Sequence, residues 1–308
     1  MTTPGEVTVG GVTVRLSRPG KPMFPDDGIS KGDLVEYYRS MAPRILPYTR
    51  DRPLVMIRYP DGISGQAIVQ KNVSRNFPDW ITRAAVRKQG GTNSQVVADK
   101  PATLVYLANQ ACDELHVFLS RLSALDQPDQ LVFDLDPPDA GHFGLACRTA
   151  LSLRSLLEVE LGLAAYVKTT GGKGLHVHVP LRPGEGFDSV REFARQAADL
   201  LAGRAPEELS TAQRREERGG RLYLDIMRNA YAQLVVAPYS VRGRPGAPVA
   251  TPLHWDELGN GSLSPGQFTM RTIGARLDKV GDDPWADMAR RRRGLSGPRR
   301  RLRNLSAG

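Results

Sequence analysis

The chain has 308 residues, of which 40% are hydrophobic and 24% charged, with a net charge of +9, values typical of a folded globular protein with a basic surface. No apolar run approaches the ~20 residues of a membrane-spanning helix, and the start MTTPGEVTVGG lacks the basic and apolar regions of a signal peptide. Cys112 and Cys147 are too few for a disulfide framework or a zinc cage, so we expect a reducing cytoplasm and no membrane partner.

The first third of the chain carries strand and turn signals around one helix. GEVTVGGVTVRLSR alternates Val and Thr about a Gly-Gly pair, which predicts a β-hairpin. Ser30, with Asp33 three positions later, forms a variant capping box and predicts a helix through about Leu46. Further along, RPLVMIRYP indicates a buried strand, GISGQAIVQKN a turn followed by another strand, and DELHVFLSRLS fits either a helix or a strand.

The rest of the chain alternates strands and helices. Strands are expected at 131–136, on both sides of a glycine-rich turn within 164–181, and at 222–227; helices are expected at 145–162, at 187–204 and in part of 205–221. The Pro/Gly-rich stretch at 237–258 is too irregular for a core helix. These elements predict a mixed α/β or α+β fold with two sheets.

Two carboxylates stand close together in LVFDLDPPD, residues 131–139. In a strand, Asp134 and Asp136 point to the same face, and Pro137 ends the strand because it cannot donate to a ladder. Two adjacent buried carboxylates repel each other, so a metal ion, an Arg/Lys cluster or plain solvent must share the space. Asp225 in LYLDIM is a third acid in a similar setting. Three such acids suit a pair of Mg²⁺ or Mn²⁺ ions for phosphoryl transfer; capping loops or pairing with arginines is the alternative.

A second signal is TTGGKGLHVHV, residues 169–179. Its glycines allow backbone N–H groups to approach an anion, and Thr170 and Lys173 add a hydroxyl and a charge. His176 and His178 alternate with apolar residues and should share one strand face. The spacing is not that of a Walker A motif, and a plain hairpin turn is the alternative interpretation.

Together these motifs resemble a known family. FDLDPP, TTGGKGLHVHVPL, DIMRNAYAQLVVAPYSVRGRPGAPVATPL and QKN followed by RNFPDW are similar, in order and spacing from Val14 to Trp285, to the polymerase domain of bacterial ATP-dependent DNA ligase D, of the archaeo-eukaryotic primase superfamily. The resemblance implies two β-sheets flanked by helices with the active site between them. We expect one primase-polymerase domain at 1–289 and a basic, disordered tail at 290–308.

The resemblance also implies roles for individual residues. Metal binding and catalysis fall to Asp134, Asp136 and Asp225, and nucleotide-phosphate binding to His116, Thr170, Lys173, His176 and Arg242. Lys21 and Lys31 match a pocket for the 5′-phosphate of a downstream DNA strand. Lys31 also makes independent sense at the first position of a capped helix, where its charge joins the helix dipole; exposed lysines without a partner are the alternative.

Two departures from the family pattern matter. Ile68 and Val69 stand where the family has paired phenylalanines that stack on the template, so stacking, worth ~1–3 kcal/mol per base with aromatic residues, should be weaker. The sequence contains no Lys-x-Asp-Gly ligase nucleophile motif, so we expect a polymerase without a ligase domain. The tail either grips DNA non-specifically or is an inert solubilising end.

The resemblance therefore implies a template-dependent nucleotidyltransferase that adds nucleotides, with a preference for ribonucleotides, to DNA primers, gaps or ends with two divalent cations, Mn²⁺ or Mg²⁺, in repair or end joining. Expected partners are DNA, NTP or dNTP, an end-binding protein and a separate ligase, in a nucleoid-associated setting. The basic charge favours nucleic acid, although Arg supplies 34 of 42 basic residues and a GC-rich genome explains that equally well. A DNA-end-binding module with little activity and a metal-dependent phosphodiesterase are the alternatives.

Overall fold

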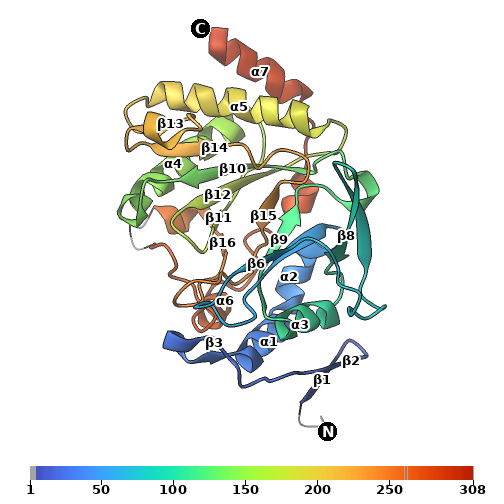
Figure 1. The fold of residues 1–308 in the computed structure, drawn as a ribbon. Helices are drawn as coiled ribbons and strands as arrows, with labels where there is room; N and C mark the ends of the chain where they lie inside the picture. The colour runs from blue at the N-terminus through green and yellow to red at the C-terminus, as the bar shows by residue number, and fades with distance from the viewer. Residues whose placement is uncertain (1–4, 260, 262, 308) are drawn as a thin grey trace. The chain divides into compact units, whose positions relative to one another are not determined.

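The computed structural model describes residues 5–259, 261 and 263–307. The chain divides into two compact units. Unit 1 comprises Met1–Phe118, Leu234–Ala250 and Phe268–Lys279, and unit 2 comprises Leu119–Gln233, Thr251–Gln267 and Val280–Gly308. Each unit contains a six-stranded sheet, so the two predicted sheets are confirmed for the described residues (Figure 1). The predicted boundary at residue 289 lies within unit 2, and the single domain at 1–289 and the location of the active site between the sheets stay predictions.

The N-terminal elements of unit 1 follow the predicted order. β1 (Glu6–Val9) and β2 (Val12–Arg15) form the expected hairpin, with Gly10 and Gly11 at the positive φ angles that its turn requires. β3 (Pro22–Phe24) and β4 (Ile29–Ser30) form a short pair before α1 (Lys31–Ser40). The predicted single helix through Leu46 is two helices, because α2 (Ala42–Thr49) starts anew with Pro43 in its first turn, where a missing N–H costs nothing.

The capping box at the start of α1 forms as predicted. The Ser30 hydroxyl oxygen accepts from the Asp33 backbone N–H at 3.2 Å, and the Asp33 carboxylate accepts from the Ser30 N–H at 2.8 Å. Two backbone donors that the helix cannot satisfy are thereby paired. The cap fixes the position of Lys31, the first residue of α1.

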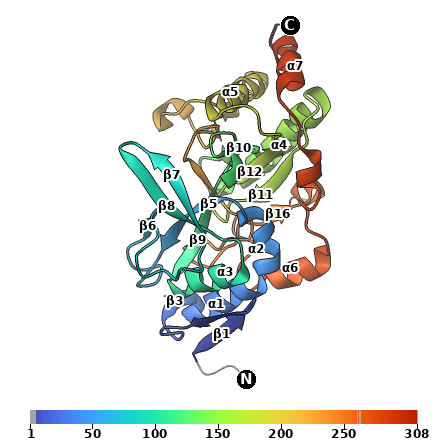
Figure 2. The same ribbon diagram turned by 90° about the vertical axis from the view of Figure 1, so that its right-hand side faces the viewer.

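The sheet of unit 1 is antiparallel throughout. Its strands, in spatial order, are β15 (Leu234–Val236), β9 (Cys112–Phe118), β5 (Pro53–Arg58), β8 (Gly91–Val97) and β7 (Arg83–Lys88), with β6 (Ile68–Gln70) also paired to β5. The ambiguous segment 113–123 therefore contributes a strand. The sequence analysis did not anticipate α3 (Pro101–Asn109), α6 (Ile273–Val280) or the β7–β8 hairpin, visible in Figure 2. β7 gives a weak signal because its buried positions are only Ala84 and Val86.

The sheet of unit 2 contains the predicted acidic strand at its centre. Its strands, in spatial order, are β13 (Leu209–Ser210), β14 (Leu222–Asp225), β10 (Gln130–Asp136), β12 (Leu175–Pro180), β11 (Tyr166–Thr169) and β16 (Pro252–Leu253). α4 (Phe143–Ser155), extended by a π-helical turn at Leu156–Glu160, and α5 (Phe187–Arg204) contact β10. The alternate side chains of β10, Leu131, Phe133 and Leu135, are fully buried. The apolar face of β10 therefore meets the helices, and its acids point to the other face.

The expectation of a disordered tail is wrong for the described residues. Ser296–Ala307 forms α7, which contacts α5 and is drawn next to it in Figure 1. Leu295 and Leu302 are buried, and Arg299 donates to the Glu185 carboxylate at 2.6 Å. Just before α7, Arg292 pairs with the buried Asp129 at 3.2 Å. Few apolar residues suffice for this helix because α5 supplies the surface on which it packs.

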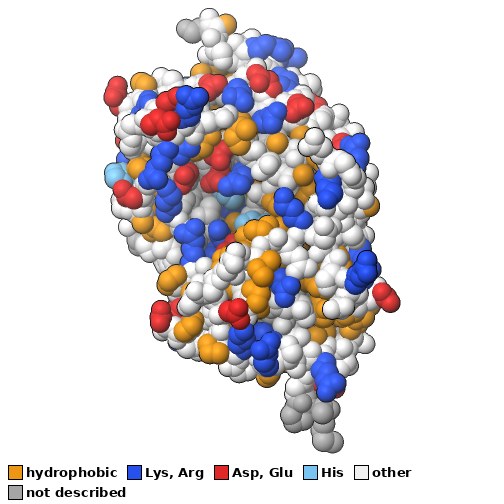
Figure 3. All heavy atoms as spheres, in the orientation of Figure 1, with side chains coloured by type: hydrophobic (Ala, Val, Ile, Leu, Met, Phe, Trp, Pro, Cys, Tyr) orange, Lys and Arg blue, Asp and Glu red, His pale blue; other side chains and the backbone are white. Residues whose placement is uncertain are grey.

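Among the described residues, no helix has both the length and the apolar character needed to cross a membrane. Lys and Arg side chains are spread over the face shown in Figure 3 and are interspersed with Asp and Glu. The net charge of +9 is therefore not concentrated in one block on this face.

Candidate active site

Four ionisable side chains form one row across the sheet of unit 2. The strand register sets Asp225 of β14 opposite Asp134 of β10, Asp134 opposite His176 of β12, and His176 opposite Lys168 of β11. Directly opposed residues of antiparallel strands project to the same face. The structure thus brings together three residues that the sequence analysis singled out and adds Lys168, which it did not.

Asp134 lies at the centre of this row and is largely buried. Its Oδ1 is 3.5 Å from His176 Nε2, and its Oδ2 is 3.5 Å from Arg228 Nε. Burial alone would raise the pKa of Asp134, but His176, Arg228 and Lys168 lower it below its ordinary value. Burial, aided by the charge of Lys168, lowers the pKa of His176 to about 4. At neutral pH the row therefore holds an ionised Asp134 beside a neutral imidazole.

Asp136, at the end of β10, has a different set of neighbours. Lys173 Nζ lies 3.1 Å from its Oδ1 and also donates to the carbonyl oxygens of Pro137 and Pro138 at 2.6 and 3.2 Å. Arg218 lies 3.9 Å from the other carboxylate oxygen. The glycine-rich turn thus places its lysine at the end of the acidic strand, a contact that the sequence analysis did not anticipate.

The contacts of Asp225 differ from those of the two acids of β10. Its Oδ1 accepts from the Met227 backbone N–H at 2.7 Å and from the Tyr223 hydroxyl at 3.4 Å. Burial raises the pKa of Asp225, and the charge of Asp134 adds to that effect. The Arg218 guanidinium lies over the Tyr223 ring at 3.8 Å, at the edge of the acidic group.

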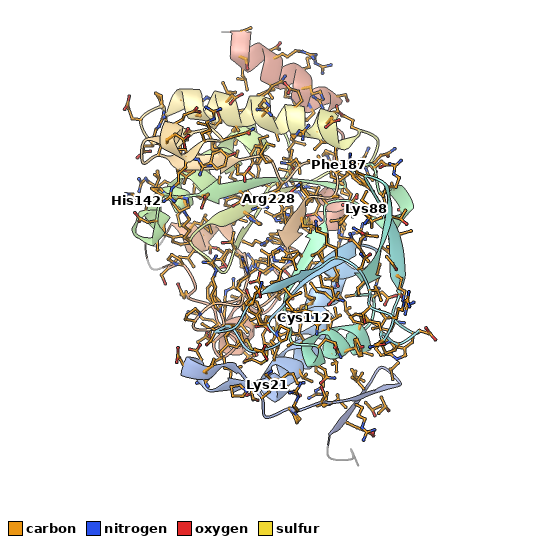
Figure 4. All side chains as sticks on the ribbon, viewed as in Figure 1. Lys21, Lys88, Cys112, His142, Phe187 and Arg228 are labelled. Atoms are coloured by element: carbon orange, nitrogen blue, oxygen red, sulfur yellow. The ribbon has the colours of Figure 1, made fainter. Side chains whose placement is uncertain are left out.

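Basic side chains lie close to these acids. Lys173, Arg218 and Arg228 are each within ion-pair distance of Asp134 or Asp136, and Figure 4 shows Arg228 beside β10 and β12. Within the described ranges, no three Asp, Glu, His or Cys side chains are gathered closely enough to hold a metal ion. The acids nevertheless fit a divalent cation in kind, because they are oxygen donors placed on adjacent strands of one sheet face.

The glycine-rich turn is closed by its own hydrogen bonds. Thr170 donates its hydroxyl to the Gly174 carbonyl at 3.0 Å and accepts from the Gly172 N–H at 3.2 Å. Gly171 has a φ of 67°, and a Cβ at Gly174 would lie 2.3 Å from the Leu135 carbonyl oxygen. Only glycine fits at Gly174, which lets the start of β12 approach β10 closely.

His178 has a different environment from that of His176, although both lie on the predicted face. The two rings are 5.8 Å apart. His178 Nδ1 contacts Gln130 Oε1 at 2.9 Å, and its ring lies 4.8 Å from that of the buried Trp285. His178 is thus part of the packing of unit 2, while His176 contacts the acidic row.

A second polar group lies in unit 1, around two residues predicted to contact the triphosphate. His116 of β9 and Arg242 both contact the Glu114 carboxylate, at 2.9 and 2.8 Å. Gly243 donates its backbone N–H to the same carboxylate at 3.0 Å, and the Tyr59 hydroxyl lies 3.4 Å from it. The sequence analysis missed Glu114, although its spacing of two from His116 on a strand signals a shared face.

Lys21 and Lys31 lie near the start of α1 in unit 1. Lys31 is almost fully buried and donates to the Ser17 hydroxyl at 2.9 Å. Burial lowers its pKa, and the charges of Arg18 and Lys21 lower it further. Lys21 donates to the carbonyl of Pro60 and pairs with Asp61 at 3.0 Å. The structure thus gathers the two predicted lysines and adds Arg18, which the sequence analysis did not single out.

The two residues at the predicted template-stacking positions are exposed. Ile68 and Val69 on β6 have exposed fractions of 46% and 59%, which makes them unusual among the large hydrophobic residues that the structure describes. They pair with Arg58 and Ile57 of β5. Such exposure fits a surface that contacts a flat partner, but neither side chain offers an aromatic ring.

Comparison with known proteins completes the description of the site. The sequence matches the family model described as LigD, primase-polymerase domain, over residues 30–285. It is 36% identical over 290 residues to the multifunctional non-homologous end joining protein LigD of Pseudomonas aeruginosa, covering 94% of this chain and 34% of that protein. The bifunctional LigD of Bacillus subtilis is 32% identical over 263 residues, covering 85% of this chain and 42% of that protein. The chain thus spans less than half the length of these curated relatives.

The fold is similar to that of a solved relative. The polymerase domain from Mycobacterium tuberculosis ligase D, in complex with DNA, matches with a TM-score of 0.81 and 29% sequence identity, covering 87% of this chain and 96% of that one. The match confirms the predicted fold class, a mixed α/β fold of the ligase D polymerase type.

Proposed function

Because the chain belongs to the LigD primase-polymerase family, we propose that it is a template-dependent nucleotidyltransferase that adds ribonucleotides or deoxynucleotides to DNA primers, gaps or ends. The relatives are non-homologous end joining proteins, which supports a role in that kind of DNA repair. For end joining we propose an end-binding protein and a separate ligase, acting in trans, as its partners.

The observation that carries this proposal is the placement of three acids on two adjacent strands of unit 2. Nucleotide addition forms a bond between a primer 3′-oxygen and the α-phosphorus of a nucleotide, and releases pyrophosphate. Asp134, Asp136 and Asp225 would hold the divalent cations, since the first two lie on one strand and Asp225 lies opposite Asp134 on the next. Such ions, when bound, activate the attacking hydroxyl and stabilise the charge on the phosphates.

The basic side chains next to these acids could also bind the phosphates of the nucleotide. Lys173 and Arg228 are 40% and 44% exposed, so both side chains have room to leave the carboxylates when a more strongly charged partner arrives. A triphosphate is such a partner, because charge-assisted hydrogen bonds to phosphate are strong. We therefore assign Lys173, together with Thr170 and His176, to the binding of the nucleotide phosphates in unit 2.

The cationic group near the start of α1 supports a DNA contact. Burial depresses the pKa of Lys31, the like charges of Arg18 and Lys21 depress it further, and an anion near the three cations would relieve their repulsion. The capped N-terminus of α1 favours negative charge as well. The M. tuberculosis domain was solved with DNA, and we propose that this group binds the 5′-phosphate of a downstream strand.

One observation favours a second candidate function. Ile68 and Val69 are exposed but lack aromatic rings, so a template base would be held less firmly than by a stacking residue. A protein of this fold that binds DNA ends and extends them poorly would show the same surface. The two functions differ in turnover, not in DNA binding.

A primer-extension assay separates these possibilities. The purified chain is incubated with gapped DNA, Mn²⁺ or Mg²⁺, and labelled ATP or dATP. We expect template-dependent extension that EDTA abolishes. DNA binding without extension would favour the end-binding function, and shortening of the primer would indicate a phosphodiesterase.

A further inference from the structure

The Glu114 carboxylate is the meeting point of the polar group in unit 1, and we propose that Glu114 is a positioning residue that holds His116 and Arg242 for binding the nucleotide triphosphate. This inference rests on the proposed function and adds a residue and a role to it. Glu114 is expected to act through its two partners and not to touch the nucleotide itself.

The first support is geometric. Glu114 Oε2 accepts from Arg242 Nε at 2.8 Å and contacts His116 Nε2 at 2.9 Å, while Oε1 accepts from the Gly243 N–H at 3.0 Å. A guanidinium is a rigid planar fork, so fixing Nε fixes the direction of its other donors. Fixing Nε2 of an imidazole likewise fixes the direction of Nδ1. One carboxylate thus sets the orientation of both predicted phosphate contacts.

The second support comes from burial. The Glu114 side chain is 4% exposed, whereas those of His116 and Arg242 are 18% and 16% exposed. The carboxylate therefore lies beneath its two partners, which keep contact with the surface. A buried carboxylate persists only where it is paired and hydrogen-bonded, as this one is. The Glu114 carboxylate thus interacts with His116 and Arg242 and has little contact with solvent.

The third support is that the backbone near Arg242 is anchored without Glu114. The Arg242 N–H donates to the Pro248 carbonyl at 2.8 Å, and Val241 and Val249 form a β-bridge. Tyr38 receives the Val241 N–H at its hydroxyl oxygen at 3.2 Å. Losing the Glu114 charge should therefore release the Arg242 side chain while leaving the loop in place.

Gly243 packs tightly against Tyr59, next to the Glu114 carboxylate. A Cβ at Gly243 would lie 2.2 and 2.3 Å from two carbons of the Tyr59 ring and 2.6 Å from its hydroxyl oxygen. Any side chain there would displace Tyr59, whose hydroxyl is 3.4 Å from Glu114. The absence of a side chain at Gly243 thus brings both its own N–H and Tyr59 against the carboxylate.

The test uses Glu114→Gln, which keeps the shape of the side chain and removes its charge. Asp113→Asn is the matched control, since Asp113 is a fully buried neighbour on the same strand whose carboxyl oxygens have no hydrogen-bond partner among the described residues. Two quantities are measured in each variant: the Kd for ATP by equilibrium dialysis and the KM and kcat for ATP in primer extension. Loss of a charge-assisted pair should raise Kd and KM about 10-fold in Glu114→Gln, with kcat much less affected. Asp113→Asn should match the wild type.

A double-mutant cycle separates positioning from a general structural role. In an Arg242→Ala background, Glu114→Gln should raise the Kd far less than about 10-fold, because most of its effect passes through Arg242. An equal effect in both backgrounds, or an unchanged Kd in Glu114→Gln alone, overturns the inference. A wild-type chain that binds ATP but never extends a primer would contradict the proposed function, and the dialysis result would still decide the role of Glu114.

Discussion

Replacing Glu114 with Gln should make the stability of the protein less dependent on pH. Burial alone would raise the pKa of this carboxyl, but the hydrogen bond from His116, the charges of Arg242 and His116, and the Gly243 N–H lower it from 4.5 to about 2. A carboxyl with a depressed pKa stabilises the folded state above its unfolded pKa. That contribution is lost as the pH falls toward the folded pKa.

The size of the effect follows from that difference. At about 1.4 kcal/mol per pKa unit, the ionised Glu114 stabilises the folded state by about 3 kcal/mol at pH 5.5 and above. At pH 3 the unfolded chain is already protonated at this position while much of the folded protein is not, so about 1 kcal/mol remains. The Gln variant lacks this contribution at every pH.

The assay is urea denaturation of the wild type and Glu114→Gln at pH 5.5 and pH 3. Other groups that titrate over this interval are the same in both proteins, so the difference between them isolates Glu114. We expect the wild type to be more stable by about 3 kcal/mol at pH 5.5 and by about 1 kcal/mol at pH 3. A difference that stays constant or grows on acidification would refute this reasoning.

Three further outcomes are expected. Arg228→Gln should tighten Mn²⁺ binding several-fold in the absence of nucleotide, as measured by calorimetry, because it removes a cation 3.5 Å from the central acid of β10. Lys21→Ala and Lys31→Ala should abolish any preference for a gap with a 5′-phosphate over one without, in binding titrations. Arg300→Gln with Arg303→Gln should leave the salt dependence of DNA binding unchanged, because α7 packs on α5, a helix that contacts β10 on its apolar face, opposite to its acids.

A control variant or a contradicting outcome can be named for each of these three expectations. Lys88 on β7 is exposed and lies well away from Lys21 in Figure 4, so Lys88→Ala should keep the preference for a 5′-phosphate. Equal Mn²⁺ affinity in Arg228→Gln would mean that the ion pair does not compete with the metal. A log-log salt slope that falls by about 0.9 per lost contact on duplex DNA would show that α7 binds phosphates.

The placement of Asp134 and Asp136 on one face of a strand could be predicted because side chains alternate between the two faces of a strand. Asp134 and Asp136 alternate with Phe133 and Leu135, so one face of β10 had to be polar and the other apolar. The prolines after Asp136 marked the end of the strand. The register that sets Asp225 and His176 opposite Asp134 could not be predicted, because pairing between distant strands depends on the whole fold.

Other features escaped prediction for identifiable reasons. Glu114 lay in a segment that fitted a helix or a strand, and only the strand puts it on the face of His116. Arg18 lies in the loop between β2 and β3, where no sequence pattern singles it out, and it matters here through its charge near Lys31. The helix α7 has too little apolar content to signal a folded segment, and Leu302 becomes buried only because α5 lies nearby.

The most direct test of the proposed activity is nucleotide addition by Asp136→Asn, which keeps the shape of the side chain but removes its charge. Extension of a gapped primer and binding of the same DNA are measured side by side for the wild type and the variant. We predict that the wild type extends the primer, that the variant does not, and that both bind DNA alike, because DNA affinity rests mainly on Lys and Arg. Extension by the variant at the rate of the wild type would contradict the assignment of Asp134, Asp136 and Asp225 as the catalytic centre.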